Sequence, residues 1–131
     1  MASPDELERQ HTLSTATTRY DELRMRDALA SMHGHGEATP LNREETLEML
    51  ALSEVVIRKA GYGRQAMVRS ARGASATWTQ IGVALGSSKQ AAWEAHSRWI
   101  DEQARQHDRT GYEGLDPGQA DAARGLAGRP D

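Results

Sequence analysis

The chemistry open to this sequence depends first on where its charged side chains lie. Residues 56–100 hold seven Lys and Arg residues and one acidic residue, Glu94, although the whole chain has a net charge of −3. A basic segment inside an acidic chain is typical of a surface that binds a polyanion. The alternative is that the basic segment pairs with the acidic segments inside the fold.

Side chains suited to catalysis or metal binding are sparse. The 131 residues include no cysteine, which excludes a disulfide and a thiolate metal site. His33 and His35 flank Gly34, but two histidines without further ligands indicate a helix-ending turn better than a metal site. No paired carboxylate, activated nucleophile or phosphate-binding glycine loop is present. We therefore expect no enzyme activity, metal or cofactor, and no small-molecule effector is evident.

The elements that would position the basic residues are two closely spaced helices. Thr77 with Gln80, and Ser87 with Gln90, each match the capping box that begins a helix. Gly86 can adopt the left-handed conformation that ends the first helix. The inward faces are predicted to consist of Trp78, Ile81 and Leu85 on the first helix and of Ala92, Ala95 and Trp99 on the second. This pattern predicts a tight helix-turn-helix.

Helical patterns extend over most of the chain, and strand-forming residues are too sparse for a sheet. Further helix starts are predicted at Ser3 and Asn42, and residues 64–72 are expected to form a short helix. We therefore predict an all-α protein with a trihelical helix-turn-helix core, additional N-terminal helices and an extended recognition helix. The expected divisions are an acidic helical region (1–40), a helix-turn-helix DNA-binding domain (41–107) and a flexible, glycine-rich C-terminal tail (108–131).

The segment G-A-S-A-T-W-T-Q-I-G-V-A-L-G-S-S-K-Q-A-A-W resembles the helix-turn-helix DNA-binding segment of many small bacterial regulators. The resemblance covers residues 64 to about 100 and implies a trihelical fold, sequence-dependent binding to double-stranded DNA, and usually a dimer. We therefore expect a transcriptional regulator. The alternative is a protein-interaction module in which the helix pair is architectural and the basic face docks an acidic partner. With no signal peptide and no long apolar run, we expect a cytoplasmic, nucleoid-associated protein without a membrane partner.

In such a motif the start of the second helix enters the major groove. The expected base-reading residues are Ser88, Lys89, Gln90, Trp93, Glu94 and Ser97. The expected phosphate contacts are Arg64, Arg69, Arg72, Thr77 and Ser87. Gln90 can bond N6 and N7 of adenine but cannot cap the helix in the same conformation. Packing inside the domain is the competing interpretation for Trp93, and Glu94 is suited either to accept from cytosine or to exclude wrong sequences.

Surplus apolar residues indicate how two such motifs could be paired. Residues 47–57 are apolar on more than one face of a predicted helix, and Trp99 and Ile100 extend the second helix of the motif. We expect these side chains to form a homodimer, which doubles the base contacts. The alternative is a monomer in which the N-terminal helix covers this surface.

Overall fold

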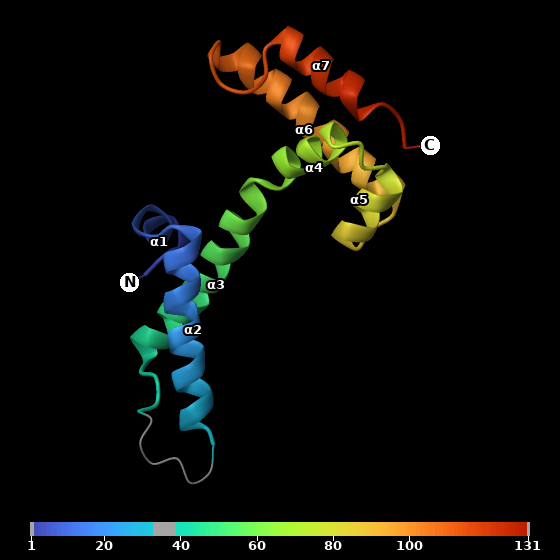
Figure 1. The fold of residues 1–131 in the computed structure, drawn as a ribbon. Coiled ribbons are helices and arrows are strands. Elements are labelled where there is room, and N and C mark those ends of the chain that lie inside the picture. The colour runs from blue at the N-terminus through green and yellow to red at the C-terminus, as the bar shows by residue number, and fades with distance from the viewer. Residues whose placement is uncertain (1, 33–38, 131) are drawn as a thin grey trace. The chain divides into compact units, whose positions relative to one another are not determined.

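The computed structural model describes residues 2–32 and 39–130, and its regular structure over these residues is entirely helical. This confirms the predicted all-α class. The chain divides into two compact units, residues 1–63 and residues 64–131 (Figure 1). These bounds differ from the predicted divisions after residues 40 and 107. Within the described residues, no helix has the length and apolar character needed to cross a membrane.

The first unit contains helices α1 (Pro4–Gln10), α2 (Leu13–Ala30) and α3 (Arg43–Tyr62). Each begins at a side-chain cap, because an oxygen of Ser3, Thr12 or Asn42 accepts from a free backbone N–H of the first turn. Asn42 and Glu45 form the complete capping box that the sequence predicted. The helices α2 and α3 run side by side, so α3 belongs with the N-terminal helices rather than with the helix-turn-helix (Figure 1).

The core of the first unit is small and is built mainly between α2 and α3. Leu23, Leu52 and Val55 are almost completely buried, and burial of each such side chain stabilises the unit by roughly 1.5–3 kcal/mol. Two ion pairs join the same helices at the edge of the core, Arg19 with Glu48 and Arg26 with Glu45. The acidic residues Glu45 and Glu48 are thus engaged inside their own unit.

The second unit contains helices α4 (Arg64–Gly73), α5 (Trp78–Leu85), α6 (Lys89–Thr110) and α7 (Pro117–Ala127). The short helix expected at residues 64–72 is confirmed as α4. The core draws on all four helices, with Val68 from α4, Trp78 and Ile81 from α5, Ile100 from α6 and three alanines from α7. The structure thus adds a fourth helix to the predicted three.

The prediction of a flexible tail is wrong for residues 117–127, because they form α7. Asp116 and Gln119 make a capping box, and Pro117 occupies the first helical position, where its missing N–H costs nothing. The small side chains Ala120, Ala123 and Ala127 share the buried face of this helix, which allows close packing against the rest of the unit. The glycines and prolines around this segment led to the prediction of a tail, although the segment forms a short amphipathic helix.

Candidate nucleic-acid interface

The turn between α5 and α6 has the conformation that the sequence predicted. The Thr77–Gln80 capping box is complete, and Gly86 has φ 70° and ψ 30°, the left-handed conformation that favours glycine. Gly82 lies against the turn itself, since a Cβ on this residue would lie 2.8 Å from the Ser87 carbonyl oxygen. A backbone hydrogen bond of 2.8 Å from Ser87 N to the Gly82 carbonyl closes the turn. The path of the chain from α5 into α6 therefore depends on this close approach.

The start of α6 differs by one residue from the predicted start. The N-cap is Ser88 rather than Ser87, and the Ser88 hydroxyl oxygen accepts from Ala91 N at 3.0 Å. The predicted Ser87–Gln90 capping box is therefore wrong. Gln90 lies in the first turn of α6, where its side-chain amide donates to Glu94 Oε1 at 2.9 Å. The Gln90 side chain is thus not used as a cap and remains on the surface.

The predicted base-reading residues fall into two groups. Ser88, Lys89, Gln90 and Glu94 are exposed in the first turns of α6. Trp93 and Ser97 are half-buried and, with Ala127 and Gly128, line a small cavity of about 260 Å³. Trp93 and Ser97 thus lie beside the end of α7 and are less accessible than the other four residues.

Three side chains from three different helices bind the carbonyl groups at the C-terminal end of α7. Trp78 Nε1 donates to the Ala127 oxygen at 2.7 Å, and Trp93 Nε1 donates to the Gly128 oxygen at 2.6 Å. Arg72 Nε donates to the Leu126 oxygen at 3.2 Å. The last carbonyls of a helix have no partner within the helix, so these donors satisfy groups that would otherwise need water. The C-terminal segment is therefore held on α4, α5 and α6.

The predicted phosphate-binding residues differ in how far the fold engages them. Arg64, Thr77 and Ser87 are exposed, although the Thr77 oxygen also caps α5. Arg72 donates to the Ala76 carbonyl as well as to Leu126 and lies 5.2 Å from the centre of the Trp78 ring. Much of its guanidinium is thus used inside the unit.

The basic residues of α4 and the first part of α6 are not neutralised by carboxylates. Among the described residues, no ion pair involves Arg64, Arg69, Arg72, Lys89 or Arg98. Arg69 is half-buried and lies 5.6 Å from the centre of the Trp99 ring. Later in the unit, by contrast, Arg105 and Arg109 both pair with Glu102. Helix α4 and the first part of α6 therefore carry basic residues without a described carboxylate partner.

Comparison of the chain with protein-family models, with curated proteins and with solved structures found no match.

The basic segment itself is divided between the two units. Arg58, at its start, belongs to α3 and pairs there with Asp5, Glu8 and Glu54. For Arg58, the alternative interpretation holds, because its charge is paired with acidic residues inside the fold. Arg64 and Lys89 remain available to an external anion.

A buried histidine is the main residue of the second unit that the sequence did not reveal. His96 is 1% exposed and lies between Trp78 and Trp99, with ring-centre distances of 5.6 and 5.4 Å. Its Nδ1 is 2.9 Å from Gln65 Oε1. Burial lowers the pKa of His96, and the nearby Arg69 and Arg72 lower it further. The inward face of α6 is therefore Ala92, His96 and Ile100 rather than the predicted Ala92, Ala95 and Trp99.

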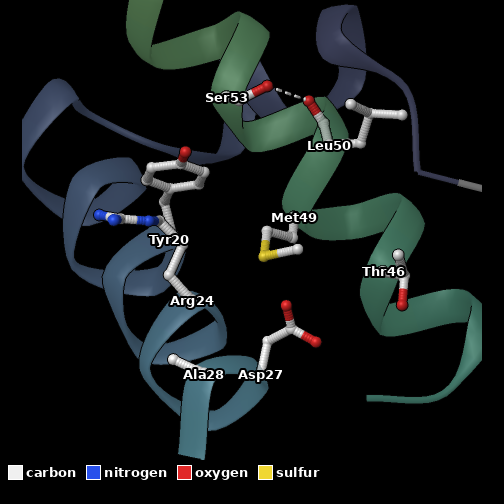
Figure 2. A pocket seen from close by; sticks show the side chains of 8 residues that line it. All are labelled: Tyr20, Arg24, Asp27, Ala28, Thr46, Met49, Leu50 and Ser53. Carbon is white, nitrogen blue, oxygen red and sulfur yellow. Dashed lines mark hydrogen bonds between the residues drawn. The ribbon is translucent and has the colours of Figure 1, made fainter. Parts of the chain in front are cut away.

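The first unit has a separate surface groove of about 480 Å³ between α2 and α3. Figure 2 shows Met49 between the two helices, with Tyr20, Arg24 and Asp27 on α2. Asp27 is the one carboxylate among the lining residues, so the groove offers no paired carboxylates for acid–base catalysis. Its apolar lining suits the packing of another apolar side chain.

No cluster of three or more His, Asp or Glu side chains that could hold a metal ion occurs among residues 2–32 and 39–130. The His33–Gly34–His35 sequence, where a helix-ending turn was expected, lies outside the described residues.

Proposed function

We propose that the chain binds double-stranded DNA sequence-specifically through α5 and α6, and that it acts as a transcriptional regulator associated with the nucleoid. The observation that carries this proposal is the exposed start of α6. Lys89, Gln90 and Glu94 stand free of the core immediately after the tight turn at Gly86. Major-groove recognition by a helix-turn-helix uses side chains at this position, which place donors and acceptors against base edges.

The unpaired basic residues supply the second part of the argument. Phosphate contacts provide most of the affinity of a DNA-binding protein, and base contacts provide its sequence preference. Arg64 and Lys89 are exposed and form no ion pair with a described carboxylate. Both are therefore suited to phosphate binding, and Lys89 also to guanine O6 or N7.

The experiment that tests DNA binding compares exposed and paired basic residues. Arg64→Ala and Lys89→Ala should weaken binding to non-specific DNA, and each should lower the salt slope by about one unit if its side chain binds one phosphate. Arg105→Ala is the matched control, because Arg105 is also exposed but pairs with Glu102. Fluorescence anisotropy at several salt concentrations measures both quantities. Identical binding by parent, Arg64→Ala and Lys89→Ala at every salt concentration would contradict the proposed phosphate role.

Site selection from randomised DNA separates this function from its alternative. A sequence-specific regulator should enrich a defined motif, whereas a module that docks an acidic protein should bind DNA weakly and without sequence preference. Enrichment of one motif by the parent protein would support a sequence-specific regulator. A selected pool without an enriched motif would favour the protein-interaction module.

We further infer that the DNA-bound form is a homodimer. One helix-turn-helix makes few base contacts, and two copies one helical turn of DNA apart, about 34 Å, would read an inverted repeat. Ile100 is buried and Trp99 is half-buried against His96, so these residues provide little of the surplus surface that was expected. Leu50 and Ile57 on α3 remain exposed, at 66% and 67%. Leu50 borders the groove of Figure 2, which makes this part of the first unit the better candidate for the contact.

A further inference from the structure

The hydrogen bond between Gln90 and Glu94 determines which way the Gln90 amide points. The two exposed side chains lie one turn apart on α6, and Gln90 Nε2 is 2.9 Å from Glu94 Oε1. A carboxylate only accepts hydrogen bonds, so the amide must turn its NH₂ group toward Glu94. The Gln90 oxygen and the second N–H then remain free for a ligand.

This pair of free groups matches one base edge better than the others. Adenine presents an amino donor at N6 and an acceptor at N7, which suit the Gln90 oxygen and its remaining N–H. Guanine presents two acceptors, O6 and N7, which need two donors and would meet the negative charge of Glu94. Within the DNA-binding function proposed above, on which this inference rests, we propose that Glu94 positions Gln90 to select adenine and disfavour guanine.

The magnitude of this effect follows from the freedom of the glutamine side chain. A free Gln90 would have to be ordered when DNA binds, and ordering one such side chain weakens affinity by a factor of about 2 to 12. Glu94 removes part of this cost because it holds the amide for part of the time before DNA arrives. Glu94 is then a positioning residue, and loss of its hydrogen bond should affect the preference at one base pair, separately from the general effect of its charge.

Two substitutions at position 94 separate the hydrogen bond from the charge. Glu94→Gln and Glu94→Ala both remove the negative charge, so both should strengthen non-specific binding to a similar extent. The amide oxygen of the glutamine variant can still accept from Gln90, whereas alanine cannot. The difference between the two variants therefore reports on the orientation of Gln90.

The experiment first selects sites from randomised DNA with the parent and with Gln90→Ala, and the base pair at which the two motifs differ is assigned to Gln90. Affinities are then measured on sites that differ only in adenine or guanine at this base pair. Both variants should lose the part of the adenine preference that the negative charge contributes against guanine. Glu94→Ala should reduce the preference further than Glu94→Gln, by about 1.4- to 2.3-fold, because only alanine also removes the hydrogen bond to Gln90. Circular dichroism on all variants checks that α6 is retained.

Two outcomes would overturn the positioning role while leaving the proposed function intact. In the first, Glu94→Ala keeps the full adenine preference of the parent. In the second, both Glu94 variants change the preferred base at a position that Gln90→Ala leaves unchanged, which would mean that Glu94 contacts a base directly, as a cytosine amino group would allow. If the parent itself selects no motif, the proposed sequence-specific function fails, and this inference fails with it.

Discussion

Replacement of Gly82 by alanine tests the geometry of the turn between α5 and α6 directly. The added Cβ would lie 2.8 Å from the Ser87 oxygen and 3.0 Å from Lys89 N. Both atoms belong to the backbone of the turn, so no side-chain rotation can relieve the contact. The turn would have to move, and overpacking of this kind typically costs about 1–3 kcal/mol.

A matched control separates the close contact at Gly82 from the intrinsic preference of helices for alanine over glycine. Gly125 is an exposed helical glycine in the same unit, and a Cβ there would meet nothing within 4 Å. Alanine at either position gains roughly 0.5–1 kcal/mol from helix propensity. Gly125→Ala should therefore stabilise the second unit. Gly82→Ala should be less stable than Gly125→Ala by about 1–3 kcal/mol, the cost of the close approach alone.

Tryptophan fluorescence during urea unfolding is the suitable assay. All three tryptophans of the chain, Trp78, Trp93 and Trp99, belong to the second unit, so the signal reports this unit separately from the first. The free energies of unfolding of the parent and both variants are compared with the same dependence on urea concentration for all three proteins. Equal stability of Gly82→Ala and Gly125→Ala would refute the close contact at the turn.

Three further predictions follow from other contacts. Because burial lowers the pKa of His96, the unfolded state binds a proton more readily than the folded state. The free energy of unfolding should therefore not depend on His96 above about pH 6.5, and it should fall as the pH drops below that value. His96→Leu should remove this pH dependence. The same change in unfolding free energy with pH for the parent and His96→Leu, measured by urea unfolding, would contradict this prediction. Trp93→Phe removes the donor to Gly128 and should cost about 0.5–1.5 kcal/mol, with faster amide exchange at the end of α7; unchanged exchange would exclude that role. Leu50→Glu should dissociate the homodimer, whereas Met25→Glu, at a similar exposed fraction of 64%, should not. Sedimentation of the parent as a monomer on DNA would reject the dimer.

The local signals in the sequence were sufficient to predict the start and the end of α5. Thr77, Gln80 and Gly86 act through neighbouring backbone atoms, and the structure confirms both their capping box and their helix end. Adjacent serines were harder to separate, since Ser87 and Ser88 are equally good caps. The three-residue spacing to Gln90 favoured Ser87, but the structure uses Ser88. An error of one residue is expected when two neighbouring side chains can perform the same capping function.

Long-range packing accounts for what the sequence did not reveal. Glycine and proline content made residues 108–131 look like a tail, although Asp116, Pro117 and Gln119 carry a capping signal. The burial of His96 was equally hidden, because imidazole is polar and its partners, Trp78 and Gln65, come from other helices. Whether Gln90 and Glu94 read bases stays a prediction, since their exposure shows availability rather than contact.

The length of α6 is explained by α7. The proposed role in the major groove would need only the first turns of α6, yet this helix continues to Thr110. Its buried residue Ile100 shares a core with the alanines of α7, while Trp93 binds the end of that helix. The first turns of α6 can thus expose Gln90 and Glu94 because later parts of the same helix are fixed by packing. A side chain discriminates between bases best when its helix is held rigidly. Within the proposed DNA-binding function, we therefore expect α7 to support base recognition without contacting Gln90 or Glu94.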